Sequence, residues 1–283
     1  MISSPPDFLV QPIIEAALAE DLGRAGDITS RACVAEDARM PAVFRARRPG
    51  VIAGLACARL AISALDPTAR FAAQTADGDS IAAGAVLAKV EANARALLGA
   101  ERVGLNLLSR LSGIATLTAA YVVAVAGTEA RIVDTRKTTP GLRMLEKHAV
   151  RCGGGDNHRF GLDDAILIKD NHVVAAGSIR EALRRARGAA GHLVKVQIEV
   201  DSLAQLDEAL ASRDAPDVIM LDNFTLADLV TAVARTAGRA RLEASGGIDL
   251  TTVAAVAAAG VDQISVGALT HSAPALDIGL DAV

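Results

Sequence analysis

The chain has 283 residues, of which 51% are hydrophobic and 22% charged, a composition typical of folded domains rather than of disordered chains. Its aromatic residues are five Phe and one Tyr, so the core must be built from aliphatic side chains, and a base-stacking nucleic-acid platform is disfavoured. The 29 basic and 33 acidic side chains give a net charge of -4, which argues against a general polyanion-binding protein.

The cysteines and the apolar segments bear on the cellular compartment in which the protein is expected. Cys33, Cys57 and Cys152 lie far apart without a C-x-x-C pair, which disfavours a disulfide framework and a cysteine-rich zinc site. The N-terminus has no signal-peptide pattern, and the most apolar stretch, Ile114–Ala126, is interrupted by two threonines and is short for a bilayer. We therefore expect a cytoplasmic protein with neither a membrane nor a nucleic acid as partner.

The first part of the chain mixes helix and strand patterns. Apolar residues at helical spacing predict a helix at Gln11–Ala19, and alternation predicts a strand at Pro41–Arg47. Short strands are expected within Ser80–Val90. Helical spacing then runs through Ala94–Ala126, with Gly99, Gly104 and Gly113 as candidate breaks. The segment is typical of an α+β module.

From Arg131 onward, short β-rich runs alternate with helical stretches. This rhythm predicts six βα units, and therefore a parallel sheet or an incomplete barrel whose ligands meet the loops at the carboxyl ends of the strands. The predicted strands are Ile132–Thr135, Ala165–Ile168, Val194–Val200, Val218–Leu221, Arg241–Ala244 and Gln263–Val266.

Polar and glycine residues follow these predicted strands. Because the carboxyl ends of parallel strands share one edge, the residues should converge on one site, although loops are often simply polar. They are Arg136 and Lys137, Lys169, Glu199, Asp222 and Asn223, Ser245-Gly246-Gly247, and Gly267-Ala268.

Two of these groups suit a phosphate. Ser245-Gly246-Gly247 leads into a helix expected to begin near Asp249, and Gly267-Ala268 follows the last strand. Glycines let an oxyanion approach the main chain, and a helix N-terminus adds favourable partial charge. The alternative for either motif alone is an ordinary turn.

The window 131–172 is locally basic, with eight Lys and Arg, six Asp and Glu, and three of the five His. Arg136, Lys137 and Lys169 follow strands, which favours a site for a small anion carrying several carboxylates or phosphates. Arg143 and Lys147 fit a solvated helix face instead.

Other residues of this window are also candidates for site roles. The three glycines that precede Asp156 permit unusual backbone torsions and should aim His158 and Arg159 inward. A metal site made of histidines is disfavoured by their spacing, and Cys152 is interpreted as a small buried residue rather than a nucleophile.

Two carboxylates, Glu199 and Asp222, end neighbouring predicted strands within this cationic surrounding. Bound Mg²⁺ explains them, because it would let carboxylates approach a pyrophosphorylated sugar. They could also bond ribose hydroxyls or stabilise positive charge at the anomeric carbon, and the alternative is a structural role in ion pairs with the basic rim.

Taken together, these motifs make the sequence resemble the bacterial quinolinate phosphoribosyltransferase family over nearly its whole length. The resemblance rests on E-D-L-G-R-A-G-D-I-T-S (Glu20–Ser30), E-R-V-G-L-N-L-L (Glu101–Leu108), D-T-R-K-T-T-P-G-L-R (Asp134–Arg143), R-C-G-G-G-D-N-H-R-F-G-L-D-D (Arg151–Asp164), L-I-K-D-N-H (Leu167–His172), I-M-L-D-N-F (Ile219–Phe224), E-A-S-G-G-I (Glu243–Ile248) and S-V-G-A-L-T-H-S (Ser265–Ser272).

The resemblance implies a reaction of quinolinate with 5-phosphoribosyl-1-pyrophosphate that gives nicotinate mononucleotide, pyrophosphate and CO₂ in NAD synthesis. It implies Mg²⁺ but no organic cofactor. Lys137, Glu199 and Asp222 are then expected to be catalytic, with the metal held by the two carboxylates directly or through water. The implied substrate-binding residues are Arg102, Thr135, Arg136, Lys137, His158, Arg159, Lys169, Glu199, Asp222, Ser245, Gly246, Gly247, Val266, Gly267 and Ala268.

The resemblance also implies the architecture. We expect an N-terminal α/β sandwich at residues 1–112, completed by the tail 272–283, and an incomplete α/β barrel of about six parallel strands at residues 113–271. The implied assembly is a homodimer or a dimer-based hexamer, in which Arg102 reaches the neighbouring active site. One departure is Gln197, where relatives often have Glu.

Three rival functions stay open from the sequence. A transferase of the same fold could act on another acid, as in molybdenum-associated relatives. Lys169 could form a Schiff base in an aldolase-like barrel. The chain could also be a binding protein that has lost activity, although none of the expected site residues is missing.

Overall fold

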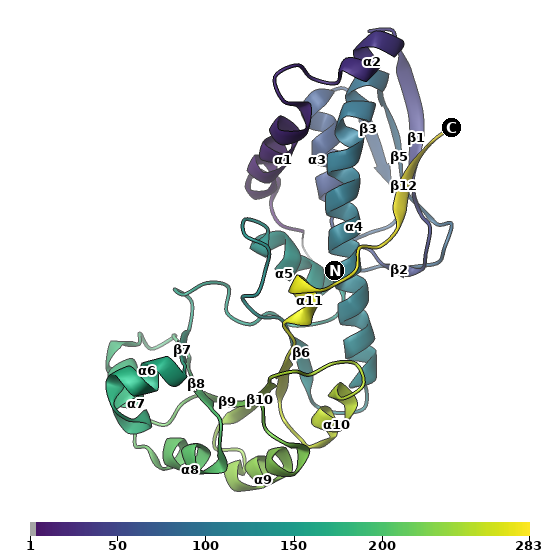
Figure 1. Ribbon diagram of the computed structural model, residues 1–283. Coiled ribbons are helices and arrows are strands. Elements are labelled where there is room, and N and C mark those ends of the chain that lie inside the picture. The colour runs from purple at the N-terminus through teal and green to yellow at the C-terminus, as the bar shows by residue number, and fades with distance from the viewer. Residues whose placement is uncertain (1–3) are drawn as a thin grey trace. The chain divides into compact units, whose positions relative to one another are not determined.

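Residues 4–283 are described by a computed structural model and divide into two units (Figure 1). The first unit comprises the chain up to Ala119 together with Thr138–Gly154 and Leu269–Val283. The second comprises Ala120–Lys137 and Gly155–Ala268. The chain thus passes from one unit to the other four times.

The first unit contains an antiparallel sheet of four strands in the order β12-β1-β5-β3. The strands are β1 (Arg39–Ala46), β3 (Arg70–Ala73), β5 (Val86–Asn93) and β12 (Ile278–Ala282), and β2 (Gly50–Val51) pairs with β4 (Ser80–Ile81) in a separate ribbon. The C-terminal strand β12 therefore lies beside β1 in one sheet. Phe44 of β1 is fully buried and pairs with Ala88 and Leu280, which marks the core side of the sheet.

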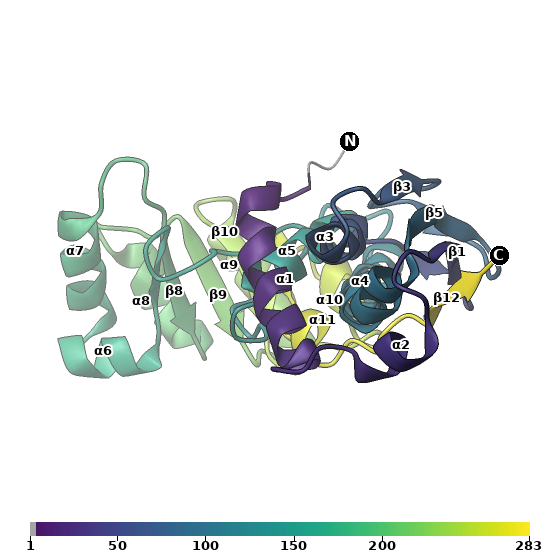
Figure 2. The same cartoon turned by 90° about the horizontal axis from the view of Figure 1, so that it is seen from above.

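Helices cover one face of this sheet (Figure 2). They include α1 (Asp7–Leu22), α3 (Leu55–Leu65) and the long helix α4 (Ala94–Ala124), while α2 (Ile28–Cys33), α5 (Arg143–Cys152) and α11 (Ala268–His271) complete the helices around it. The buried residues of α1 recur every fourth position, at Val10, Ile14 and Leu18. The apolar spacing that predicts this helix thus forms its buried stripe.

The predicted breaks in the long helix are wrong, because α4 is continuous through Gly99, Gly104 and Gly113. A Cβ at Gly104 would lie 3.3 Å from Cα of Ala58, and one at Gly113 would overlap the carbonyl of Pro274. These glycines therefore let neighbouring backbone approach the helix closely, and this packing outweighs their low helix propensity.

Among the described residues, α4 is the one helix whose length and composition would allow it to cross a membrane. Half of its most apolar window is buried inside the structure. A helix in a protein core can have the same length and apolar composition, since burial in protein and burial in lipid both favour apolar side chains.

The second unit contains a sheet of six parallel strands in the order β6-β11-β10-β9-β8-β7. The strands are β6 (Arg131–Val133), β7 (Ile166–Ile168), β8 (Val196–Val200), β9 (Val218–Asp222), β10 (Arg241–Ser245) and β11 (Gln263–Ser265). The order begins and ends with β6 and β7, which do not pair, so the barrel is open. The predicted fold class, with six parallel strands and an incomplete barrel, is confirmed.

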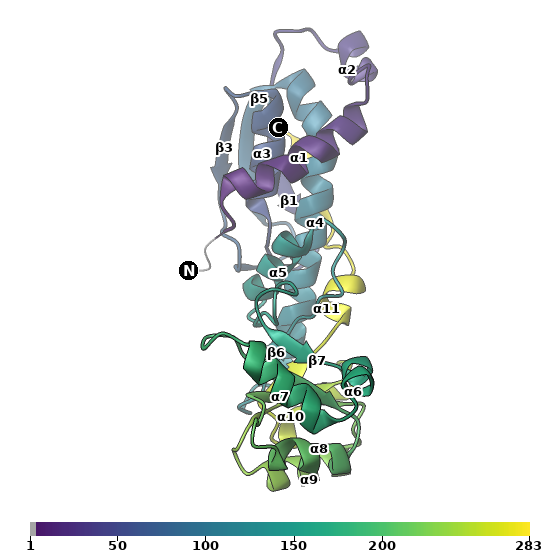
Figure 3. The same cartoon turned by 90° about the vertical axis from the view of Figure 1, so that its left-hand side faces the viewer.

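Helices follow the strands along the outside of the curved sheet in Figure 1. They are α6 (Asp170–Ala176), α7 (Ile179–Ala189), α8 (Leu203–Ala211), α9 (Leu226–Thr236) and α10 (Val253–Ala258). Helix α7 lies beside α6 and packs on edge strand β7 (Figure 3). The inner strands are buried on both faces, which explains why they read as continuous apolar runs in the sequence.

Two local predictions are corrected by the structure. The helix expected to begin near Asp249 begins at Val253 as α10, because the Asp249 side chain and backbone first accept hydrogen bonds within the turn 249–252. Lys147 is not on a solvated face, since it is only 1% exposed, and Arg143 is half-buried. Other parts of the chain pack around this part of helix α5, so Glu146 and Lys147 are buried while Arg151, near its end, is exposed.

Candidate active site

The predicted acidic residues lie on adjacent strands of the parallel sheet. Strand β8 pairs with β9, and Asp222 at the end of β9 is directly opposite Ser245 at the end of β10. Glu199 lies inside β8, one residue before its end, rather than after the strand as predicted. Glu199, Asp222 and Ser245 therefore occupy the carboxyl ends of three consecutive strands.

Lys169 joins this edge through Glu199. It follows β7, whose last residue, Ile168, is paired with Ile198, so Lys169 is level with Glu199. The ammonium Nζ donates to Glu199 Oε2 at 2.8 Å. The Lys169 side chain is 48% exposed and that of Glu199 is 14% exposed, so the lysine reaches from solvent to a mostly buried carboxylate.

Two guanidinium groups lie close together in the same unit. The pKa of Arg159 is lowered by burial and by the positive charge of Arg136, and Asp164 opposes this only partly. Arg159 Nη1 donates to the Ala165 carbonyl at 3.2 Å. Among residues 4–283, Arg136 Nε is one of the few buried side-chain atoms without a hydrogen-bond partner. The two arginines form a local excess of positive charge.

Both the main chain and the ring of His158 make hydrogen bonds. Its backbone N–H donates to Asp134 Oδ1 at 2.8 Å, and its Nδ1 accepts from the Arg159 N–H at 2.7 Å. Because Nδ1 is an acceptor, the proton lies on Nε2, which is 3.5 Å from Glu243 Oε2. Glu243, 1% exposed, also accepts from Gln197 Nε2 at 2.8 Å.

Two of these side chains, Asp134 and Glu243, were not among the predicted site residues. Asp134 is fully buried directly after β6, and Glu243 is a carboxylate inside the apolar strand β10. A charged residue within a buried strand is a usable sequence signal, since such residues are rarely buried without a partner.

The glycine turn after β10 has the backbone freedom that was predicted. Gly246 has φ 97° and Gly247 has φ 60°, and around Gly247 there is open space for an approaching group. The expected helix dipole is absent, because α10 starts six residues later and is only six residues long. The backbone N–H groups of this turn are therefore open to an anion without a helix N-terminus behind them.

The remaining predicted residues differ in their placement. Lys137 is exposed, and its N–H donates to Thr135 Oγ1 at 3.0 Å. Val266 is buried at the end of β11, and Gly267 and Ala268 after it are half-buried. Arg102 lies exposed on α4, in the first unit, and is the one predicted site residue outside the second unit.

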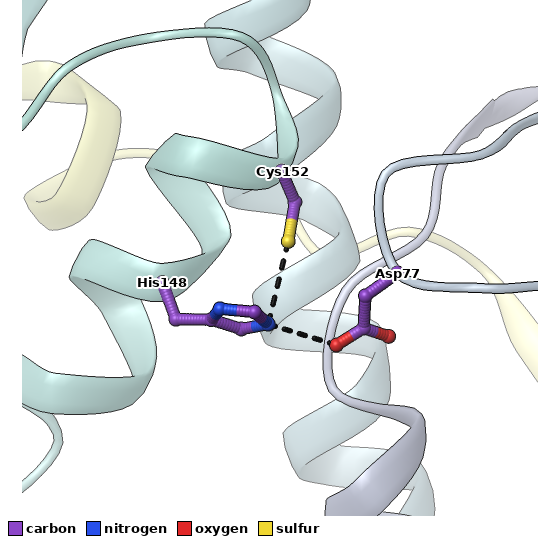
Figure 4. Close-up of side chains that lie close together, drawn as sticks. All are labelled: Asp77, His148 and Cys152. Carbon is purple, nitrogen blue, oxygen red and sulfur yellow. Dashed lines mark hydrogen bonds and ion pairs between the residues drawn. The ribbon is translucent and has the colours of Figure 1, made fainter. Parts of the chain in front are cut away.

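A separate cluster lies in the first unit, where Asp77, His148 and Cys152 face one another (Figure 4). His148 Nε2 is 2.8 Å from Asp77 Oδ2 and 3.4 Å from Cys152 Sγ. Asp77 also accepts the N–H groups of Gly54 and Leu55 at the start of α3.

This cluster has a structural explanation. Both carboxylate oxygens of Asp77 already accept hydrogen bonds, and burial together with the Asp77 charge raises the pKa of the Cys152 thiol to about 12. The thiol therefore keeps its proton, in agreement with its interpretation as a small buried residue. We interpret the cluster as a link between α3 and α5.

Most of the chain matches one protein family. Residues 27–112 match the family model "Quinolinate phosphoribosyl transferase, N-terminal domain", and residues 114–281 match the C-terminal domain of the same family. Nicotinate-nucleotide pyrophosphorylase [carboxylating] of Mycobacterium leprae is 50% identical over 95% of each chain. The probable enzyme of that name from Bacillus subtilis is 48% identical over 93% of this chain and 89% of the relative.

Solved structures agree over the full length. The nicotinate-nucleotide pyrophosphorylase of Francisella tularensis superposes with a TM-score of 0.93 at 38% identity, covering 100% of this chain and 99% of that one. NadC of Streptococcus pyogenes gives a TM-score of 0.94 at 41% identity, covering 99% of both chains. The resemblance seen in the sequence motifs is confirmed. This chain belongs to the quinolinate phosphoribosyl transferase family.

Proposed function

We propose that this protein transfers the phosphoribosyl group of 5-phosphoribosyl-1-pyrophosphate to quinolinate, and so makes nicotinate mononucleotide, pyrophosphate and CO₂ for NAD synthesis. The observation that carries the proposal is the pair of neighbouring guanidiniums, because burial and Arg136 lower the pKa of Arg159. Two like charges held together in a partly buried place are unfavourable until an anion neutralises them. Quinolinate, with two adjacent carboxylates, is such an anion.

The acid is bound by the cationic residues of this edge. Arg136 and Arg159 suit bidentate contacts with the carboxylates. The Lys169 ammonium, which donates to Glu199 in the free protein, adds a point charge. His158 is assigned to the same group, and Lys137 is assigned a contact with both substrates. An aldolase-like role for Lys169 needs an uncharged amine, whereas Lys169 forms an ion pair.

The sugar substrate is bound by the strands on the other side of Glu199. Backbone N–H groups of Ser245–Gly247 and Val266–Ala268 are assigned to the 5-phosphate, and the positive φ angles of Gly246 and Gly247 support a close approach. Glu199 and Asp222 are assigned to the ribose hydroxyls. Thr135 belongs to the same substrate-binding set.

The donor set at these strand ends fits Mg²⁺. Glu199 and Asp222 are carboxylates on adjacent strands, and hard oxygen ligands are what this ion prefers. They would hold it directly or through water. When bound, the ion neutralises charge on the pyrophosphate leaving group.

The chain's own residues contribute alignment and electrostatics. The pyridine nitrogen attacks the anomeric carbon as its bond to pyrophosphate breaks, and the carboxylates of Glu199 and Asp222 stabilise the positive charge that develops there. No protein nucleophile takes part. The ribosylated nitrogen is then cationic, so the adjacent carboxylate can leave as CO₂ while its electron pair stays on the ring carbon, which takes up a proton. The substrate thereby acts as its own electron sink in place of an organic cofactor.

The test is a turnover assay with Mg²⁺, phosphoribosyl pyrophosphate and either quinolinate or nicotinate. We expect quinolinate to be consumed, with release of CO₂ and pyrophosphate. Arg159→Ala and Lys169→Ala should each cost about 2 to 5 kcal/mol, roughly 30- to 5,000-fold in kcat/KM, because a bound carboxylate loses its partner. Lys195→Ala is the matched control, since Lys195 is 73% exposed and pairs with Asp217 before the amino end of β8. Near-normal quinolinate turnover by both site variants would refute the assignment.

We also propose that the protein acts as a homodimer, or as a dimer-based hexamer, in which Arg102 enters the neighbouring active site. The exposure of Arg102 on α4 supports this. Mixing inactive Arg102→Ala and Lys169→Ala proteins tests it, because a mixed dimer would contain one site with both residues intact. Recovery of activity is expected, and its absence in mixtures shown to exchange subunits would contradict the proposal.

A further inference from the structure

Asn223 has an unusual backbone conformation at the candidate site. It follows Asp222 directly and has φ 56°, in the left-handed region that few non-glycine residues adopt. Among the described residues, Ala237 is the only other non-glycine residue with positive φ, and there the conformation ends helix α9. Asn223 ends no helix, so its conformation has another cause.

The contacts of Asn223 join two parts of the site. Its side-chain Nδ2 donates to Asp222 Oδ2 at 2.7 Å, and its backbone N–H donates to the Ser245 carbonyl at 2.9 Å. Its amide oxygen occupies the space beside Gly246, where a Cβ would overlap it. One residue thus contacts the carboxylate assigned to the ribose and the glycine turn assigned to the phosphate.

We propose that Asn223 is a positioning residue that holds Asp222 and the Ser245–Gly247 turn in a fixed relation, so that the ribose and its 5-phosphate are bound in register. The proposal rests on the function proposed above, and it assigns Asn223 no contact with the reacting atoms. The left-handed backbone brings the amide back toward Asp222 while the N–H still reaches β10. Strained conformations of this kind persist where surrounding contacts impose them.

The same geometry explains the need for glycine at position 246. Gly246 has φ 97°, and its missing side chain leaves the space that the Asn223 amide fills. The D-N and S-G-G motifs, which lie more than 20 residues apart in the sequence, therefore form one structural unit.

Two substitutions of Asn223 separate the side chain from the backbone. Asn223→Gly adopts the left-handed conformation easily but lacks the amide, and Asn223→Asp keeps the shape but replaces the donor by a second carboxylate beside Asp222. Ala237→Gly is the matched control, because it relieves positive φ far from the site in sequence, at the end of α9.

For Asn223→Gly we expect KM for phosphoribosyl pyrophosphate to rise about tenfold or more, the loss typical of a hydrogen bond to a charged group, with a larger rise for Asn223→Asp. KM for quinolinate and the melting temperature should change little in Asn223→Gly, and Ala237→Gly should match the wild type. An unchanged KM for the sugar substrate, or equal rises for both substrates, would overturn the proposal.

Calorimetric binding of phosphoribosyl pyrophosphate with Mg²⁺ separates this inference from the proposed function. If the wild type binds this substrate but does not consume quinolinate, the proposed function fails. In that case, weaker binding by Asn223→Gly than by the wild type still supports the positioning role, and unchanged binding refutes it.

Discussion

The buried ion pair of the first unit gives a quantitative prediction for stability. Glu146 of α5 is fully buried, and its carboxylate accepts from Arg110 Nε and Nη2 at 3.0 and 2.8 Å. The Thr139 N–H and hydroxyl donate to the same carboxylate at 3.0 and 2.8 Å. Arg110 also donates to the Thr270 carbonyl, so one guanidinium connects three segments of the chain.

Replacing Arg110 by Met should destabilise this unit strongly. The substitution keeps most of the side-chain volume but leaves a buried carboxylate with only the two Thr139 donors. Breaking a buried ion pair in this way costs about 3 to 5 kcal/mol. Because the Arg110 side chain is 29% exposed, we expect a value near the lower end of about 3 kcal/mol.

The measurement is the free energy of unfolding from urea titrations followed by circular dichroism. Arg59→Met is the matched control, since Arg59 pairs with Asp7 at 2.7 Å but both side chains are exposed. Such an exposed pair is worth about 0 to 1 kcal/mol. The double substitution Arg110→Met with Glu146→Leu should recover part of the loss, because it also removes the unpaired charge. If Arg110→Met costs no more than Arg59→Met, the assigned burial effect is wrong.

Three further predictions concern buried groups. Burial raises the pKa of Asp77, but its hydrogen bonds lower it more, so its folded pKa lies below the ordinary 3.8. The stability that Asp77 contributes should therefore be present at pH 7 and lost as the pH falls through that folded pKa, and urea titrations of wild type and Asp77→Asn should converge at acid pH. Cys152, whose pKa is raised to about 12, should react with iodoacetamide far more slowly at pH 8 than exposed Cys33, as mass spectrometry of the folded protein would show. Gln197→Glu should lower the free energy of unfolding at pH 7 by about 1 to 3 kcal/mol, because it places a second carboxyl group beside buried Glu243, and urea titration at lower pH should restore part of the loss.

The six parallel strands could be located from the sequence because buried parallel strands are short apolar runs between helical stretches. The prediction for Val218–Leu221 differs from β9 by one residue, for example. The helix expected near Asp249 begins four residues later, at Val253, because the Asp249 carboxylate accepts the N–H groups of Thr251 and Thr252 in a turn that precedes it. The continuity of α4 depends on close packing around Gly104 and Gly113, which no local pattern encodes.

The candidate site was predictable where a side chain follows a strand and not where it is held by a distant partner. Lys169 and Asp222 could be placed at one edge because parallel strands end together. The contacts of Glu243 and Asn223 depend on which strands are neighbours and in what register, as in the pairing of Asp222 with Ser245. Strand order is a property of the whole fold, so the roles of these two residues appear only in three dimensions.

The charges of the second unit are incompletely paired at the residues proposed to bind substrate. Burial and the positive charge of Arg136 lower the pKa of Arg159. Buried Arg136 Nε and Glu243 Oε1 both lack hydrogen-bond partners among the described residues. Each feature is unfavourable in the free protein and is the kind of local cost that folded proteins retain at functional sites. In the proposed function, a dianion with two adjacent carboxylates would remove the repulsion between the guanidiniums, and its binding would be favoured accordingly. In the first unit the Arg110–Glu146 pair is fully satisfied without a ligand, and this difference in pairing separates a structural ion pair from a binding site in the same chain.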